Sequence, residues 1–348
     1  VSETSVEIMY NETHMFLFDY IDIAVGEQIL EAEASYRILY NGSEVLRGEI
    51  EYSDTEGHYY LIFDSSVLIN ETTPNLGIYT IEVTFMKTYY ETEKKLLAVN
   101  VVPRSTILEA SEKSVTIEYG EEYVFMFSFM DAETGDYIMD AETLVEIYYG
   151  DAFIMGGELD QEGSEYYYVF SSREIIDGIW PYLGTYTIRV HIGKPLYVPR
   201  EKIVSITVTE IGTMAYSSPE SISIEYGDSA EVLIYYIMEN GTRIGDADVI
   251  FSVIGDGTIH GGTADYDPVL GAYIIHIDTT ILIHEPFQDD WVSFTVSVNM
   301  SRHYYAEKQL LVLLTVEKIA CSVELSDTEV VAEWGEEANI WIRIIQNS

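Results

Sequence analysis

The chain has 348 residues, with 60 Asp or Glu and 17 Lys or Arg, so its formal net charge at neutral pH is −43. This charge repels phosphate and excludes nucleic acid as an expected partner, and it also opposes binding to an anionic membrane. Because 47% of the residues are hydrophobic and 29 are Tyr, the acidic residues are predicted to coat a folded body rather than form a disordered tail.

An internal repeat with a period near 107 residues organises the chain. The same motif, an alternating strand followed by an aromatic residue and a turn, occurs in four copies, whose aromatic residues are Tyr10, Tyr119, Tyr226 and Trp334. Solenoid and propeller repeats have periods of about 20–50 residues, whereas about 107 residues is the size of a small domain. The sequence therefore predicts three domains, residues 1–103, 104–211 and 212–318, followed by a partial copy at 319–348.

Each copy consists of short runs that alternate with period two and favour β-branched and aromatic residues, which predicts strands. In the second copy the predicted strands are 114–118, 122–130, 144–149, 153–158, 165–171, 184–191 and 202–209. One helical turn is expected in each copy, at 65–70, 172–176 and 279–284. Six or seven short strands in a domain of this size predict an all-β fold of tandem antiparallel sandwiches.

The first and last parts of the chain contain different portions of the repeat. The second and third copies begin with an additional apolar run, 106–108 and 213–216, and the first copy lacks this strand. Residues 319–345 contain that strand and the next two. This tail is interpreted either as the start of a fourth repeat or as a strand segment exchanged into another subunit. Cys321, on its first strand, is predicted to be a buried structural thiol.

Two runs suggest a more specific fold. Gly77-Ile78-Tyr79-Thr80-Ile81 and Gly184-Thr185-Tyr186-Thr187-Ile188 resemble the immunoglobulin tyrosine corner, Asp-x-Gly-x-Tyr-x-Cys, with Ile in place of Cys. In the third copy Phe294 replaces the tyrosine and has no corner hydroxyl. The repeats also resemble tandem immunoglobulin-like modules of archaeal cell-surface proteins. This resemblance implies immunoglobulin-like sandwiches without disulfides in a surface layer or surface filament.

Tyrosine is abundant, and Tyr59, Tyr166 and Tyr273 mark one strand common to the three copies. Tyr suits half-buried strand positions, where its ring packs and its hydroxyl stays in contact with water. The tyrosines are therefore predicted to serve packing, with exposed rings as a sugar-stacking or protein-contact surface as the alternative.

Potential N-glycosylation sites are more frequent than chance predicts. Five of the eight testable Asn residues begin the sequence Asn-x-Ser/Thr, namely Asn11, Asn41, Asn70, Asn240 and Asn299. This frequency predicts N-linked glycans on an extracellular cell surface. Asn-Gly at positions 41 and 240 is alternatively explained by hairpin-turn chemistry, which leaves three sites.

The sequence contains no recognisable catalytic motif, so no enzymatic activity is expected. The seven His residues form no zinc-binding motif, and the sequence contains no nucleophile elbow or P-loop. Calcium is the one metal considered, because it prefers clustered hard oxygen ligands. The candidate ligands are three acidic pairs, Asp246 with Asp248, Asp265 with Asp267, and Asp289 with Asp290. The alternative is that these are solvated loop residues.

These observations predict a non-enzymatic extracellular structural protein of a surface layer, stalk or filament, which associates with further copies or neighbouring repeats. An adhesin or carbohydrate-binding module, and the non-catalytic stalk of a larger secreted enzyme, remain alternatives. The linkers near 102–105, 209–213 and 317–320 lack long Gly/Ser tracts and predict semi-rigid connections. The longest mostly apolar stretch, 310–316, is too short to span a bilayer.

Overall fold

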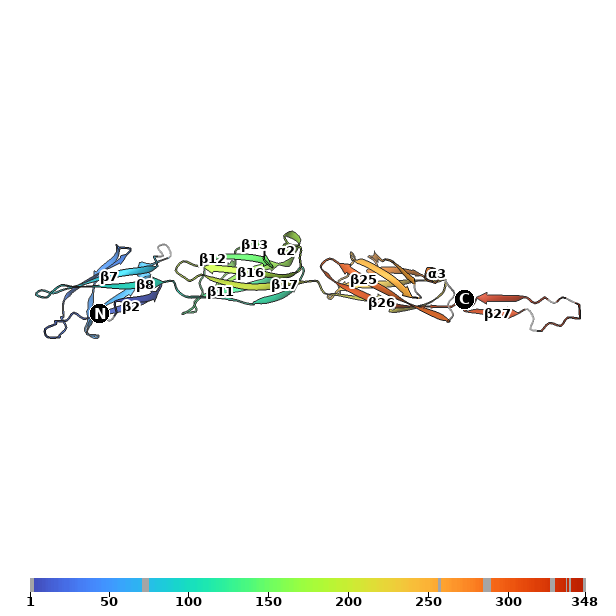
Figure 1. Ribbon diagram of the computed structural model, residues 1–348, viewed down its shortest axis with the longest axis horizontal. Coiled ribbons are helices and arrows are strands. Elements are labelled where there is room, and N and C mark those ends of the chain that lie inside the picture. The colour runs from blue at the N-terminus through green and yellow to red at the C-terminus, as the bar shows by residue number, and fades with distance from the viewer. Residues whose placement is uncertain are drawn as a thin grey trace. The chain divides into compact units, whose positions relative to one another are not determined.

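The structure is a computed structural model that describes residues 3–70, 75–255, 258–283, 289–325, 329–335, 337 and 339–346. It is almost entirely β-structure, arranged in sandwiches of two sheets each (Figure 1). By compactness the chain divides into two units, Val1–Val208 with two sandwiches and Thr209–Ser348 with the third sandwich and a terminal hairpin. In each sandwich the five-stranded sheet is called the large sheet and the other the small sheet.

The first sandwich has a large sheet in the order β1-β8-β7-β3-β4 and a small sheet in the order β2-β6-β5. β1 runs parallel to β8, and β2–β6, β5–β6, β3–β4, β3–β7 and β7–β8 pair antiparallel. The elements are β1 (Ser5–Met9), β2 (Thr13–Phe18), β3 (Glu33–Tyr40), β4 (Ser43–Glu49), β5 (Glu51–Ser53), β6 (His58–Asp64), α1 (Ser65–Leu68), β7 (Gly77–Met86) and β8 (Glu93–Val102).

The second sandwich has a large sheet in the order β10-β17-β16-β12-β13 and a four-stranded small sheet in the order β14-β15-β11-β9. β12, β16 and β17 thus belong to the large sheet and β11 to the small sheet; Figure 1 labels all four strands. The elements are β9 (Thr106–Ala110), β10 (Ser114–Glu118), β11 (Glu122–Asp131), β12 (Glu142–Tyr149), β13 (Ala152–Gly157), β14 (Asp160–Glu162), β15 (Glu165–Ser171), α2 (Ser172–Gly178), β16 (Gly184–Gly193) and β17 (Arg200–Thr209).

The third sandwich repeats this plan, with a large sheet β19-β26-β25-β21-β22 and a small sheet β18-β20-β24-β23. Its elements are β18 (Thr213–Ser218), β19 (Ser221–Glu225), β20 (Ser229–Met238), β21 (Asp248–Gly255), β22 (Thr258–Thr263), β23 (Asp265–Asp267), β24 (Ala272–Asp278), α3 (Thr279–Leu282), β25 (Trp291–Arg302) and β26 (Tyr305–Glu317). The antiparallel sandwiches and the topology, with a strand parallel to the last strand of the large sheet, confirm the predicted immunoglobulin-like fold class.

The terminal hairpin consists of β27 (Cys321–Leu325) and β28 (Ile342–Gln346). Its register pairs Cys321 with Gln346, as β9 pairs Thr106 with Asp131 and β18 pairs Thr213 with Met238. The hairpin therefore has the pairing of the first two small-sheet strands of a sandwich. Exchange of this segment into another subunit stays a prediction.

Alternation of side chains explains why these segments form two-layered sandwiches. In β7, Tyr79, Ile81, Val83 and Phe85 are buried, whereas the residues between them lie on the opposite face of the sheet. Successive side chains of a strand point to opposite faces, so period-two sequences bury one face and hydrate the other. Each buried aliphatic or aromatic side chain contributes about 1.5–3 kcal/mol to stability, so the three cores do not depend on disulfides.

The structure agrees with the predicted strands and adds short ones. It confirms the helical turns as α1, α2 and α3, although His284 of the third expectation lies outside the described residues. β14 was not predicted, because three consecutive acidic or amide residues, Asp160, Gln161 and Glu162, carry no hydrophobic period.

The prediction for Cys321 is wrong. This residue is exposed, whereas Thr106 and Thr213 at the same register positions are buried. Their small-sheet partners β11 and β20 also pair with a third strand and cover a core, whereas β28 pairs only with β27 among the described strands. Burial of this position therefore depends on a completed sandwich.

Candidate functional site

A buried ion pair lies at the junction between the first and second sandwiches, both within the unit Val1–Val208. Arg104 lies in the short connection between β8 and β9 and is only 6% exposed. Its guanidinium binds the Asp131 carboxylate at the end of β11 through two hydrogen bonds, from Nε to Oδ2 and from Nη2 to Oδ1. Its Nη1 donates to the Tyr10 carbonyl of the first sandwich over 3.2 Å.

The hairpin between β16 and β17 forms the other half of this junction. Leu196, at its tip, is 4% exposed and belongs to the hydrophobic core cluster of the first sandwich. The Arg104 main chain donates to the Leu196 carbonyl and accepts from the Val198 amide, at 3.0 and 2.9 Å. Tyr197 packs edge-on against Tyr10, with ring centroids 6.5 Å apart. Apolar and polar contacts thus join the two sandwiches at the same place.

Charge in the junction is compensated. Burial alone would raise the pKa of the Asp131 carboxyl, but hydrogen bonds from Arg104 and from the Glu133 and Thr134 amides lower this pKa below its usual value. The hydrogen bond to Asp131 likewise raises the pKa of Arg104. Both groups therefore stay ionised at neutral pH. Breaking a buried pair of this kind is costly because the remaining charge loses its partner.

The start of the third sandwich lacks this ion pair. Ile211 occupies the position of Arg104, since its amide donates to the Tyr304 carbonyl as the Arg104 amide donates to Leu196. Met238 occupies the position of Asp131 by strand register. Sequence reasoning treated residues 102–105 only as a linker and missed this site. The signal that would have found it is the joint replacement of Arg and Asp by two apolar residues in the next copy.

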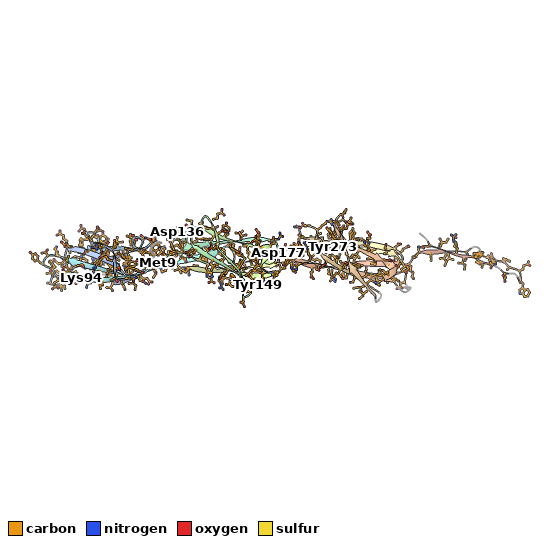
Figure 2. All side chains as sticks on the ribbon, turned by 90° about the horizontal axis from the view of Figure 1, so that it is seen from above. Met9, Lys94, Asp136, Tyr149, Asp177 and Tyr273 are labelled. Carbon is orange, nitrogen blue, oxygen red and sulfur yellow. The ribbon has the colours of Figure 1, made fainter. Side chains whose placement is uncertain are left out.

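Tyrosine hydroxyls fix the turns of each sandwich. Tyr79 donates to the Asn75 carbonyl at 2.7 Å and Tyr186 donates to the Tyr182 carbonyl at 2.6 Å, which confirms the tyrosine corner in two copies. Tyr166 donates to the Ile138 carbonyl and accepts from the Ala141 amide. Tyr59 makes the same pair of bonds, and Tyr273, labelled in Figure 2, accepts from the Ala247 amide. These rings pack in the cores, as predicted, but they are buried rather than half-buried, and their hydroxyls bond to backbone groups instead of water.

The burial of Tyr79 predicts a loss of stability at high pH. Burial, together with the neighbouring Tyr40, raises the pKa of Tyr79 to about 12. A tyrosine in the unfolded chain has a pKa of about 10. Between these values the unfolded state ionises first, so stability present below about pH 10 is lost as the pH rises towards about 12. From Tyr79 alone the loss is about 2–3 kcal/mol. Urea denaturation across this pH range should show a shallower decline for Tyr79→Phe, and equal slopes would contradict the assignment.

All five Asn residues of the predicted glycosylation sites are exposed. Asn11, Asn41 and Asn240 lie in turns, and Asn70 follows α1, whereas Asn299 lies within β25. Asn11 has φ = 67°, where the other copies have Gly120 and Gly227 at φ = 93° and 98°. Asn tolerates this left-handed region better than most residues, so turn geometry also accounts for Asn11. Glycosylation at the five positions stays a prediction.

The three acidic pairs proposed for calcium all lie within the described residues, and calcium binding at them stays a prediction. Asp246 Oδ2 lies 2.8 Å from Arg302 Nη2, and Asp267 Oδ1 accepts hydrogen bonds from the Val269 and Leu270 amides. Asp248 is the first residue of β21, and Asp265 is the first residue of β23. Asp290 Oδ1 lies 3.8 Å from Lys318 Nζ, and Asp289 is exposed. Within the described part of the chain, no three His, Cys, Asp or Glu side chains are grouped to hold a metal ion.

This arrangement predicts a nonspecific response to divalent cations. Calcium and magnesium are expected to raise the melting temperature by equal amounts at equal concentration, because both screen a net charge of −43. Differential scanning calorimetry with each chloride salt measures the two shifts. A larger shift with calcium would instead support the sequence-based calcium prediction, since calcium accepts irregular oxygen cages that magnesium does not.

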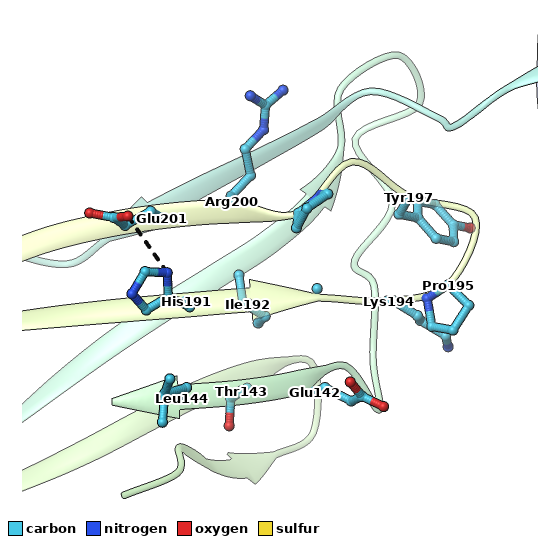
Figure 3. Close-up of a pocket in the computed structure, with 12 residues that line it drawn as sticks. Glu142, Thr143, Leu144, His191, Ile192, Lys194, Pro195, Tyr197, Arg200 and Glu201 are labelled. Atoms are coloured by element: carbon cyan, nitrogen blue, oxygen red, sulfur yellow. Dashed lines mark ion pairs between the residues drawn. The ribbon is translucent and has the colours of Figure 1, made fainter. Parts of the chain in front are cut away.

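A shallow cavity of about 610 Å³ lies over the large sheet of the second sandwich, beside the β16–β17 hairpin (Figure 3). His191 and Glu201 form an ion pair in its wall, with Nδ1 and Oε2 3.6 Å apart. Its lining includes charged residues and one aromatic ring, that of Tyr197, which already packs on Tyr10. The lining has no amide side chain, so the cavity does not match the aromatic-and-amide patch expected of a carbohydrate-binding module.

No helix within the described residues has the length and hydrophobicity needed to cross a membrane.

No protein-family model and no curated protein sequence matches the chain. The chain is similar to several solved structures. One is protocadherin gammaB7 EC3–6, with 11% identity, a TM-score of 0.33, and coverage of 100% of this chain and 84% of that one. Another is a tetra-tandem repeat in the extending region of a large adhesion protein, with 10% identity, a TM-score of 0.32, and coverage of 90% of this chain and 80% of that one. ICAM-5 D1–D4 is also similar, with 9% identity, a TM-score of 0.29, and coverage of 94% of this chain and 78% of that one. Because these TM-scores are low, the fold assignment rests on the sheets themselves, which define a tandem immunoglobulin-like repeat protein.

Proposed function

We propose that the chain is a non-enzymatic extracellular structural protein, which forms part of a cell-surface layer, stalk or filament of the archaeal type. Its sandwiches act as spacers, and its acidic exterior keeps the assembly hydrated. The observation that carries this proposal is the junction between the first two sandwiches. There Arg104, Asp131 and Leu196 turn a three-residue connection into a buried contact.

Such a junction resists bending. Movement of the second sandwich relative to the first would withdraw Leu196 from an apolar core and separate Arg104 from the Tyr10 carbonyl. Interfaces between domains are mobile by default unless they are large and hydrophobic or specifically bonded. A structural repeat protein that keeps its domains in fixed orientations under load needs buried, bonded junctions of this kind.

The glycosylation prediction fits the same role. Asn11, Asn41, Asn70 and Asn240 are exposed at turns or beside α1, where a glycan can project into solvent without displacing a strand. We propose that these four carry N-linked glycans in the exported protein. Peptide mass spectrometry of material from the native source, before and after glycosidase treatment, measures their occupancy.

Imaging of native cells tests the structural role. Antibody labelling followed by electron microscopy is expected to show a regular array or filament at the cell surface. Sparse single copies would contradict the proposal and favour an adhesin. A catalytic domain in the same reading frame would favour the stalk of a secreted enzyme.

A further inference from the structure

The large sheet of the third sandwich has an outer face whose middle carries no charge, between Asp248 at one end and Glu225 and Glu317 at the other. Phe294, Val296 and Val298 of β25 point into the core, and the alternate residues, Thr295, Ser297 and Asn299, lie on the outer side. Strand register places these outer residues in three rows with their neighbours on β21, β22, β26 and β19. The rows are Thr263–Ile250–Asn299–Gln309, Gly261–Ser252–Ser297–Leu311 and Ile259–Ile254–Thr295–Leu313–Ser221. None of these residues is charged, and we call this surface the neutral face.

The same rows carry charge in the other two sandwiches. In the first, the positions of Ser252 and Ser297 are taken by Arg37 and Glu82, which form an ion pair. In the second they are taken by Glu146 and Arg189. His191 there also lies 3.5 Å from the Glu146 carboxylate. The third sandwich thus has two serines where both others have opposite charges.

Aliphatic side chains cover the neutral face on both sides of β25. Five of them are 46–73% exposed, namely Ile250, Ile254 and Ile259 on one side and Leu311 and Leu313 on the other. Small polar groups lie between them, and the Gln309 amide donates to Ser297 Oγ at 3.1 Å. Contiguous exposed apolar surface is uncommon on soluble domains and marks interaction sites.

We propose that the neutral face is the surface through which two copies of this chain pair, sheet against sheet. The proposal rests on the structural role proposed above and names its self-association contact. A two-fold axis along β25 sets the leucines of one copy over the isoleucines of the other. The polar centres around Ser297 then face each other.

Charge is the reason for choosing a second copy as the partner. With a net charge of −43, two chains repel, and a contact that buries carboxylates would add a desolvation cost. On the neutral face no carboxylate is desolvated. A basic partner would gain no attraction from this face and would bind the acidic surfaces instead. The surface that fits this face is another flat, uncharged sheet with exposed aliphatic side chains, and the neutral face of a second copy is such a surface.

The size of the face sets the strength of the pairing. Three rows over five strands span about 14 Å along the strands and about 19 Å across them. This is about 270 Å² on each copy, smaller than a standard specific interface, so the association is expected to be weak and reversible. We therefore expect a dissociation constant of about 10–100 µM, strengthened in an array by multivalency.

The test compares two variants that add the same charge at equivalent positions. Leu311, on the neutral face, and Leu96, in the same row of the first sandwich, are 62% and 64% exposed. Sedimentation equilibrium of the unglycosylated full chain is performed at about 0.15 M salt, where the Debye length is about 8 Å. Leu311→Glu is expected to weaken dimerisation at least about tenfold, whereas Leu96→Glu leaves it unchanged. The double variant Ser252→Arg, Ser297→Glu, which copies the pair Arg37–Glu82, is expected to act like Leu311→Glu.

Three results would overturn the proposal. They are a monomeric wild-type chain at all accessible concentrations, an equal loss of pairing in both leucine variants, and a glycan at Asn299 in native material. The last would mean that sugar covers the neutral face. Matching melting temperatures of the two leucine variants exclude unfolding as the cause. A monomeric chain would refute the pairing while leaving the surface role to be decided by imaging, so the two failures are distinguishable.

Discussion

Replacing Arg104 with alanine is expected to destabilise the second sandwich by about 3 kcal/mol, one of the two largest effects that we predict. The substitution leaves the Asp131 carboxylate buried without its cation, and only the Glu133 and Thr134 amides still bind it. It also removes the hydrogen bond to the Tyr10 carbonyl. Because the pair is almost completely buried, the loss should depend little on salt concentration.

The chain supplies its own control for this experiment. The double variant Arg104→Ile, Asp131→Met copies the residues at the start of the third sandwich, Ile211 and Met238. Replacing both partners by apolar side chains avoids an unpaired charge, so this variant should recover most of the lost stability. If the double variant is as unstable as Arg104→Ala, packing of the arginine stem, rather than charge pairing, stabilises the junction.

Fluorescence can follow this one sandwich. Trp180 is the only tryptophan before residue 291, and it lies between α2 and β16. In a background where Trp291, Trp334 and Trp341 are replaced by Phe, urea denaturation monitored by the fluorescence of Trp180 reports the unfolding of the second sandwich in the full chain.

The pH dependence of stability gives a further check on the Arg104–Asp131 pair. The pKa of Asp131 is lowered in the folded state, so its contribution is present above the unfolded pKa and is lost as the pH falls through the folded pKa.

Tyr166→Phe is expected to be the other large effect, with a loss of about 2–4 kcal/mol. The hydroxyl donates to the Ile138 carbonyl at 3.0 Å and accepts from the Ala141 amide at 2.9 Å, in a site where the ring is 2% exposed. Removing it leaves a donor and an acceptor of the backbone without partners, each of which costs about 1–3 kcal/mol when buried. The same fluorescence-monitored denaturation measures the change.

Tyr186→Phe is the matched control, because it removes a hydroxyl from the same core. That hydroxyl serves as a donor to carbonyl groups, principally that of Tyr182. The third sandwich already has Phe294 at this position, and it nevertheless forms a complete core. We therefore expect Tyr186→Phe to cost less than Tyr166→Phe, and the reverse order would contradict the role assigned to Tyr166.

Much of the fold could be predicted from the sequence, because its determinants are local. Alternation in segments such as 184–191 places Tyr186, Ile188 and Val190 on one face, and the structure buries them. The tyrosine corner was recognised from five residues, since donor and acceptor lie only four positions apart in the chain. Helical turns after β6, β15 and β24 were predicted for the same reason.

Predictions that depended on neighbours distant in sequence were less successful. Cys321 lies on an apolar strand, but its burial requires strands that do not cover β27 among the described residues. For the acidic pairs proposed as calcium ligands, the structure adds the contacts of Asp246 with Arg302 and of Asp267 with backbone amides, and calcium binding at these pairs stays a prediction. The junction was not predicted, because Arg104 and Asp131 belong to segments 27 residues apart.

By itself, the sequence determined the all-β class, the repeated sandwiches and their strands, because hydrophobic period and turn chemistry act over a few residues. It also determined the net charge that any assembly must accommodate. Only the tertiary structure decided which charges are paired at the junction and which rows of the third large sheet carry none. Both depend on register: one residue of slip would move Ser297 and Asn299 into the core, and no local pattern reveals which distant strand lies beside them.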